Sequence, residues 1–256
     1  MVTEADMTMT ETRAVDRAAT VEAAARSLLL VRHDGEVSRV ALPIFYPSGA
    51  AATVEVAQNG PQFLISDAGL AYREAELIGA ENLFNRNAAP VAEQFGIDVG
   101  KRGFTVSASV DQLAGAMADV AAASVQVAHR ICERVAQRSE AAITAHLYER
   151  LVAVFGAQKV VPEAEIAGAS SHKWRVSALV HVDGKDMAFE AVSNHHSSVY
   201  SSATMFHDLS LLERKPVPVA VVKDKASFGA YLSILSQAAN VIEDTVPNAA
   251  LERLAA

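Results

Sequence analysis

Residues 174–193 have the sequence WRVSALVHVDGKDMAFEAVS, which predicts two antiparallel strands joined by a tight turn. Asp183-Gly184 is typical of a two-residue hairpin loop, since both residue types tolerate the positive φ that the turn needs. The flanking runs, Trp174–Val182 and Lys185–Ser193, are expected to be the two strands of this hairpin. Glu190, inside the second strand, is the first indication of a chemical site.

The segments around this hairpin predict an αβββαβ order for the C-terminal half. The upstream helix is expected to end at Gly156, and the last strand is almost wholly apolar, as in a strand buried on both faces. A strand, a crossover helix and a second strand form a right-handed unit, so this last strand should pair in parallel. The expected elements are a helix at Glu140–Phe155, a strand at Val160–Ile166, the hairpin, a helix ending near Leu212, a strand at Val217–Val222 and a final helix at Phe228–Ile242.

The N-terminal half predicts a small antiparallel sheet with helices. Asn59-Gly60-Pro61 favours a hairpin between two of its strands. Residues 1–12 lack an apolar period and are expected to be disordered. The expected elements are helices at Ala14–Leu29, Leu70–Ile78 and Glu81–Phe95, and strands at Val37–Tyr46, Thr53–Val56, Gln62–Ser66 and Phe104–Ala108.

A long helix is predicted between the two halves, over Val110–Arg138. Its seam has a spacing of three and four residues. Two interpretations are open: a helix packed on its own domain, or a coiled coil that makes a homodimer. The seam consists of Val110, Leu113, Met117, Val120, Ser124, Val127 and Ile131. The expected organisation is therefore α+β: a tail at 1–12, an α+β domain at 13–108, a connecting helix at 109–139 and an α/β domain at 140–256.

Composition excludes several classes of protein. The formal charge of −8 argues against broad electrostatic attraction to nucleic acid, although a local basic groove is compatible with it. No apolar run is long enough to cross a membrane, and the N-terminus lacks the parts of a signal peptide, so a cytoplasmic location is expected. The single cysteine, Cys132, cannot form an internal disulfide and is expected to pack in a helix.

Three positions of the αβββαβ order can converge: the inner face of the first helix, the second strand and the third strand. Glu149, Ser177 and Glu190 are the residues assigned to them. In this arrangement the C-terminal half resembles the PD-(D/E)xK nuclease superfamily, whose pattern is a helix Glu, an Asp on the second strand and a Glu-x-Lys triplet on the third. The resemblance implies catalytic roles for Glu149 and Glu190.

The sequence departs from that pattern at two places. Ser177 stands where the family has Asp, and Val192 stands where it has Lys, so one metal ligand and one charged group are missing. Magnesium prefers octahedral oxygen coordination with carboxylate ligands. The sequence therefore predicts no cofactor for an inactive domain, and magnesium only for an active one. The alternative interpretation of Glu190 is a partly exposed strand carboxylate.

Two groups of polar residues extend this candidate site. His195 and His196 follow the third strand: His195 is a candidate catalytic residue, and His196 a candidate metal ligand with Glu190, although surface polar residues are the simpler interpretation. Lys173 and Arg175 flank Trp174 and are candidates for binding nucleic-acid phosphates, with the indole available for stacking or for the core.

The N-terminal half carries a second pattern. Residues 63–69, FLISDAG, precede a helix, and Pro47-Ser48-Gly49 forms an upstream turn. This stretch resembles an uncharacterised domain of bacteria, phages and mobile elements that has a Thr/Ser-Asp-x-Gly turn and tends to precede a domain of the kind described above. Physically, Ser66 or Asp67 is expected to cap the helix, and Gly69 to allow close approach of the backbone.

Three functions follow as hypotheses. The first is a protein of a mobile-element or phage-conflict setting, whose degenerate nuclease-like domain binds nucleic acid or a protein partner. The second is an active metal-dependent nuclease with a migrated site built from Glu149, Glu190 and His195 or His196. The third is an acidic antagonist of a nucleic-acid enzyme, which a clustered acidic stripe would favour.

Overall fold

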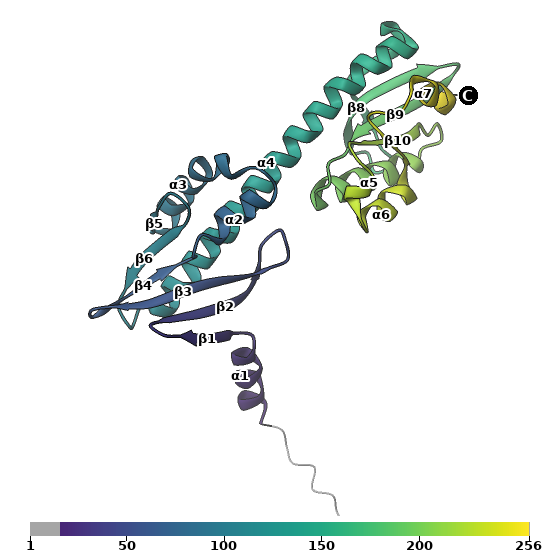
Figure 1. The fold of residues 1–256 in the computed structure, drawn as a ribbon. Coiled ribbons are helices and arrows are strands. Elements are labelled where there is room, and N and C mark those ends of the chain that lie inside the picture. The colour runs from purple at the N-terminus through teal and green to yellow at the C-terminus, as the bar shows by residue number, and fades with distance from the viewer. Residues whose placement is uncertain (1–15, 256) are drawn as a thin grey trace, which may run out of the picture. The chain divides into compact units, whose positions relative to one another are not determined.

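The computed structural model describes residues 16–255, so the tail predicted for residues 1–12 lies outside the described part. The chain divides into two compact units between His129 and Arg130, called unit 1 and unit 2 below. The fold is α+β, as predicted, with a separate sheet in each unit (Figure 1). Among the described residues, none of the helices has both the length and the apolar character of a membrane span.

Unit 1 is built on a six-stranded antiparallel sheet, with strand order β1-β2-β3-β4-β6-β5. Helices α2 and α3 and the first part of α4 lie over one of its faces (Figure 1). The strands are β1 (Leu30–Asp34), β2 (Val37–Phe45), β3 (Ala51–Asn59), β4 (Gln62–Ser66), β5 (Asp98–Val99) and β6 (Phe104–Ala108). The helices are α1 (Arg17–Ser27), α2 (Leu70–Leu77), a 3-10 turn (Glu81–Leu83), α3 (Phe84–Phe95) and α4 (Leu113–Phe155), which continues into unit 2.

Unit 2 has a mixed five-stranded sheet, with strand order β11-β10-β9-β8-β7. Strands β7, β8 and β9 are antiparallel, and β9, β10 and β11 are parallel. The strands are β7 (Val160–Ala167), β8 (Lys173–Val182), β9 (Lys185–Ala191), β10 (Val217–Val222) and β11 (Asn240–Glu243). The remaining helices are α5 (His196–Ser210), α6 (Tyr231–Ala238) and α7 (Asn248–Ala255), with 3-10 turns at Ala157–Lys159 and Ala226–Phe228.

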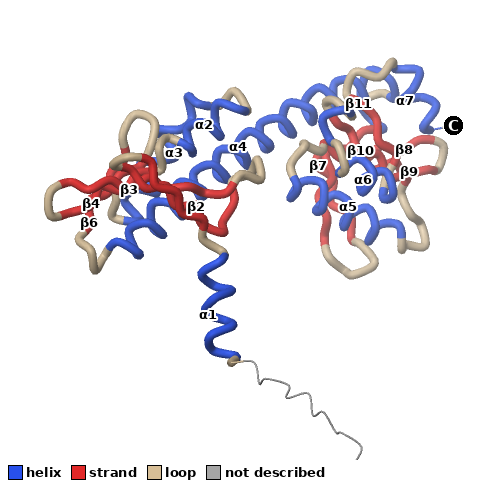
Figure 2. Tube along the Cα trace, turned by 60° about the horizontal axis from the view of Figure 1, so that its bottom comes forward, coloured by secondary structure: helices blue, strands red, loops and turns tan. Residues whose placement is uncertain are grey.

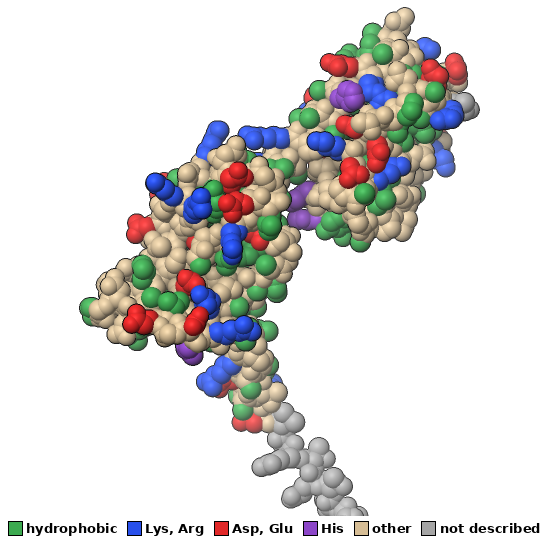
Figure 3. Space-filling model, viewed as in Figure 1, with side chains coloured by type: hydrophobic (Ala, Val, Ile, Leu, Met, Phe, Trp, Pro, Cys, Tyr) green, Lys and Arg blue, Asp and Glu red, His purple; other side chains and the backbone are tan. Residues whose placement is uncertain are grey.

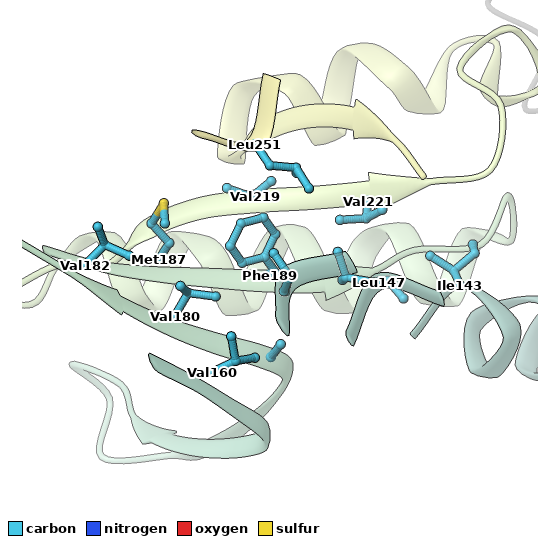
Figure 4. Packing of buried hydrophobic residues seen from close by; sticks show 13 residues of the cluster. Ile143, Leu147, Val160, Val180, Val182, Met187, Phe189, Val219, Val221 and Leu251 are labelled. Carbon is cyan, nitrogen blue, oxygen red and sulfur yellow. The ribbon is translucent and has the colours of Figure 1, made fainter. Parts of the chain in front are cut away.

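The sheet of unit 2 is covered on both faces (Figure 2). On one face, Ile143, Leu147 and Leu151 of α4 pack with Phe189 of β9 and Leu251 of α7 (Figure 4). On the other face, α5 and α6 pack against a second apolar cluster. Burial on both faces explains why β10 is an uninterrupted apolar run.

The predicted hairpin is confirmed, because β8 and β9 pair antiparallel and Asp183 and Gly184 have φ values of 50° and 77°. The predicted parallel strand is also confirmed in spite of Pro218. Pairing with β11 begins only at Val219, so the missing proline N–H lies outside that ladder.

Several elements differ from the expectations. The final helix predicted at Phe228–Ile242 is instead α6 followed by β11, since Ala239 turns extended without a Gly or Pro to mark the change. Strand β1 was not predicted, because no Gly or Pro separates the end of α1 from the apolar residues that form this strand. No break occurs at Glu140: α4 is one helix of 43 residues, consistent with the absence of Gly and Pro between Gly115 and Gly156.

Most of the expected seam is buried inside unit 1. Val120, Ser124 and Val127 have no exposed surface in the single chain, and the same holds for Ile131, which is already part of unit 2, whereas Val110, which precedes α4, is 72% exposed. A side chain already buried in its own unit cannot also form the knobs of a coiled coil. The structure therefore has the packed-helix alternative, and a homodimer would need another surface.

Candidate functional site

The strands β8 and β9 separate at the position of Glu190. Their pairing runs from Val182↔Lys185 to Ala178↔Phe189 and ends there, while β8 stays paired with β7 as far as Ala167↔Lys173. From Ser177 back to Lys173, the N-terminal part of β8 therefore pairs with β7 and no longer with β9. The fork, as it is called below, consists of Ser177 and Glu190 at this opening together with Glu140 and Ser193 beside it.

Serine donors hold the carboxylate of Glu190 in the fork. The backbone N–H and the Oγ of Ser177 both donate to Glu190 Oε2, at 2.7 and 2.9 Å. Ser177 Oγ in turn accepts the N–H of Ala191 at 3.0 Å, so the side chains replace the backbone ladder where the strands part. Thr144 Oγ1 of α4 lies 3.4 Å from the same Ser177 Oγ.

A second carboxylate, that of Glu140 on α4, borders the fork. Ser193 Oγ, two residues after β9, donates to Glu140 Oε1 at 2.6 Å. Burial raises the pKa of Glu190 to about 7, opposed by the Ser177 hydrogen bonds and assisted by the negative charge of Glu140. The fork is therefore a half-buried pair of carboxyl groups in which Glu190 takes up a proton near neutral pH.

A cavity of about 350 Å³ adjoins the fork and shares Ser193 with it. It lies where the parallel strands β9 and β10 end, the edge at which α/β sheets commonly bind ligands. Its lining consists of Ser139, Val192, Ser193, Asn194, Lys223, Asp224, Ser227 and Phe228.

The helix carboxylate of the fork is Glu140 and not the predicted Glu149. Glu149 is exposed, whereas Ile143, Leu147 and Leu151 form the buried stripe of α4. Glu140 stands three residues before Ile143 and continues that stripe at helical spacing. The same spacing in the sequence could have identified Glu140, which was already the first residue of the predicted helix Glu140–Phe155.

The histidines do not complete a metal centre. His195 Nδ1 shares a hydrogen bond with Ser197 Oγ at 2.7 Å, and the rings of His195 and His196 lie 4.3 Å apart. Over residues 16–255, no three His, Cys, Asp or Glu side chains come close enough together to hold a metal ion. The expected joint site of Glu149, Glu190 and a histidine is therefore not formed.

The predicted phosphate-binding residues are exposed on β8, but acidic neighbours reduce the positive charge of this surface. Arg175 lies 3.9 Å from Glu163 and 4.0 Å from Glu165 across the β7–β8 pair, and Lys173 is also exposed. The indole of Trp174 donates its N–H to Asp208 at 2.7 Å and packs against the α5 side of the sheet. Trp174 thus has the core role, and β8 offers no strongly basic surface.

The positions that depart from the nuclease pattern are built into the fold. Val192 has no exposed surface and belongs to the apolar cluster under α5 and α6. Ser177, at the strand position where the resemblance implies an Asp, satisfies Glu190 with two donors. The residues present do not fit the magnesium site implied by the resemblance, since one ligand and the lysine are replaced by neutral groups.

A second buried polar cluster lies in unit 1, at the Ser-Asp-x-Gly turn. Asp67 is fully buried and accepts the N–H groups of Gly69, Ala71 and Phe104, at 3.1, 3.3 and 2.8 Å. Ser124 Oγ of α4 also donates to Asp67, at 2.7 Å, and interacts with the Tyr46 hydroxyl at 2.7 Å. Burial is the main cause that raises the pKa of Tyr46 above its ordinary range.

This cluster has a structural role. The N-cap residue of α2 is Gly69, and the expected capping is met only in that the Asp67 carboxylate accepts the Ala71 N–H in the first turn. A Cβ on Gly69 would lie 2.9 Å from the Arg102 carbonyl oxygen, so the close approach is confirmed. Glu74 of α2 holds the upstream turn by accepting from Ser48 Oγ at 2.7 Å. Every contact here joins elements of unit 1, which explains the pattern without a ligand.

A scan against protein-family models and searches of curated proteins and of solved structures found no match to this chain. Inference about its function therefore starts from the fork and the adjoining cavity.

Proposed function

We propose that the chain binds nucleic acid through unit 2, which keeps the frame of a nuclease without its cutting chemistry. The observation that carries this proposal is the state of the fork. A serine hydroxyl and a backbone N–H, rather than a set of charged groups, are the hydrogen-bond partners of Glu190, and Val192 is part of the core. A fork built in this way uses the chain's own donors and leaves the adjoining cavity open for binding.

The setting of the protein is part of the same proposal. The resemblance of residues 47–69 to a domain of phages and mobile elements, followed by a nuclease-like half, supports a role in mobile-element or phage conflict. The satisfied Asp67 cluster suggests that unit 1 contributes a rigid platform. A protein partner in place of nucleic acid is the other outcome of the binding experiment below.

A cleavage assay combined with a binding assay tests the proposal. Labelled single- and double-stranded DNA and RNA are incubated with the full chain and magnesium or manganese, and binding is followed by fluorescence anisotropy. We expect binding to at least one of these nucleic acids without cleavage. Robust cleavage that Glu190→Ala abolishes and Glu149→Ala leaves intact would overturn the inactive assignment, and absence of binding to every nucleic acid would overturn nucleic acid as the ligand.

One observation favours a second candidate, an active nuclease. Glu140 supplies a helix carboxylate beside Glu190, so two acidic groups do meet in the fork. If unit 2 cleaves nucleic acid, both Glu140→Gln and Glu190→Gln should remove the activity. The predicted acidic antagonist has less support, since acidic and basic side chains alternate on the face of each unit shown in Figure 3.

A further inference from the structure

We propose that the N-terminal arm of unit 1 binds a second copy of the chain through a shared β-sheet. The arm, as it is called below, consists of α1, the linking residues Leu28 and Leu29, and β1. It lies at one end of the unit 1 sheet, and α1 extends away from that sheet in both views (Figures 1 and 2). This inference goes beyond the proposed function and does not depend on what unit 2 binds.

The arm presents apolar side chains that its own chain does not cover. None of the 11 residues of α1 is buried, and all five residues of β1 are exposed. The large apolar side chains of the arm are 46–62% exposed: Val21, Leu28, Leu29, Leu30 and Val31. An isolated helix of this length is marginal in water, so α1 needs a packing partner. Exposed apolar side chains that follow one another in this way mark an interaction surface.

Among the edges of the two sheets, β1 is the one best suited to pair with another strand. Edge strands are commonly kept from pairing by a short length or by proline. At the other edges β5 has two residues, β11 has four, and β7 contains Pro162. β1 has five residues without proline and pairs with β2 in an unbroken register over all of them. Its outer edge is therefore a regular template for another strand.

The hairpin between β1 and β2 determines which backbone groups point outward. Its turn has two residues, Gly35-Glu36, so the flanking pair Asp34↔Val37 exchanges backbone hydrogen bonds. Because hydrogen-bonded and non-bonded pairs alternate along the ladder, the N–H and C=O groups of Val31 and His33 point away from β2. These groups can pair with a strand added at the edge.

The sequence of β1 favours a second copy of itself as the added strand. Two copies related by a two-fold axis meet antiparallel, which continues the antiparallel order of this sheet. With Val31 opposite its own counterpart, Leu30 lies opposite the aliphatic stem of Arg32, and Leu29 lies opposite His33. A register centred on Arg32 places two guanidinium groups directly opposite each other, and one centred on His33 runs into the turn. The expected contact is therefore centred on Val31.

The charge and size of the arm suit such a contact. From Asp16 to Asp34 the chain has three arginines and three acidic residues, so two arms meet without net repulsion although the whole chain carries −8. Specific interfaces use about 20–30 residues on each side, which is more than β1 alone supplies. The 11 residues of α1 and the link must therefore take part as well.

Charge substitutions in the full chain test this contact. Light scattering of the unaltered chain at micromolar concentration should give twice the 27.1 kDa mass of one chain. Val31→Lys sets two ammonium groups opposite each other, and Leu30→Lys faces Arg32, so each should raise the dissociation constant at least about tenfold. Both side chains are exposed in the single chain, so neither substitution disturbs a core. Leu77→Lys is the matched control, because Leu77 is 73% exposed on α2, and it should change the constant by less than about twofold.

Cross-linking distinguishes this contact from any other dimer. In a Cys132→Ser background, Val31→Cys places two Cα atoms about 5.5 Å apart across the two-fold axis, within the range of a disulfide. Mild oxidation should therefore link two chains, whereas Ile78→Cys, exposed on unit 1 outside the arm, should not link them. A single-chain mass for the unaltered protein would overturn the proposal. A dimer that tolerates both lysine variants and does not cross-link through Val31→Cys would overturn it as well.

Discussion

Replacing Glu190 by Gln should change how the stability of unit 2 depends on pH. The carboxyl pKa is raised from 4.5 to about 7 in the folded chain, so the ionised form is less favourable folded than unfolded. The cost is absent below pH 4.5, grows as the pH rises and is complete above the folded pKa. With 1.36 kcal/mol for each pH unit, ionised Glu190 lowers the free energy of unfolding at pH 8 by about 3 kcal/mol.

The amide of Gln can still accept the two hydrogen bonds from Ser177 but does not ionise. Glu190→Gln should therefore match the unaltered chain near pH 5 and exceed its free energy of unfolding by up to about 3 kcal/mol at pH 8. Urea unfolding followed by tryptophan fluorescence measures this in unit 2, because Trp174 is the only tryptophan of the chain.

Glu149→Gln is the matched control, because Glu149 is an exposed carboxylate of the same unit. It should leave the pH dependence unchanged. If Glu190→Gln and the unaltered chain lose the same free energy of unfolding between pH 5 and pH 8, ionising Glu190 does not destabilise the folded chain. The described fork would then be wrong.

Three further predictions concern other parts of the chain. In Gly168→Ala the added Cβ would lie 1.9 Å from Asp208 Oδ2, so the free energy of unfolding should fall by roughly 1–3 kcal/mol. Urea unfolding followed by tryptophan fluorescence measures this as a lower midpoint. In Ser124→Ala the buried Tyr46 hydroxyl loses its partner, which should cost about 1–3 kcal/mol in thermal unfolding followed by circular dichroism. The affinity for nucleic acid should rise as the pH falls from 8 to 6, because protonation of Glu190 removes a repulsive charge, and anisotropy titrations of Glu190→Gln should lose this dependence.

Local signals in the sequence predicted most of the elements. The Asp183-Gly184 turn and the apolar run at Val217–Val222 were both recognised, because a tight turn and a doubly buried strand each leave a pattern within a few residues. Strand β11 leaves no such pattern. Its four residues follow α6 without a breaker and become a strand only by adding to the edge of β10.

The predictions about the site depended on a non-local feature and were less accurate. Glu190 was found because it is an acidic residue in an apolar strand, but its partner on the helix was assigned to Glu149. Glu140 was expected to be the first residue of that helix. Since α4 runs through this point, Glu140 is instead an interior residue of the helix, three residues before the buried Ile143.

The fork also shows why a missing ligand need not weaken a fold. An Asp in place of Ser177 would put a third negative charge beside Glu190 and Glu140, and a bound cation would be needed to offset it. Ser177 supplies two donors instead, and the Ser193 hydroxyl supplies one to Glu140. Introducing Ser177→Asp should therefore destabilise unit 2 in the absence of divalent cations, and magnesium should restore part of the loss if the frame can still hold a metal ion. A destabilisation that magnesium does not reduce would mean that the fork lacks the geometry to hold a metal ion.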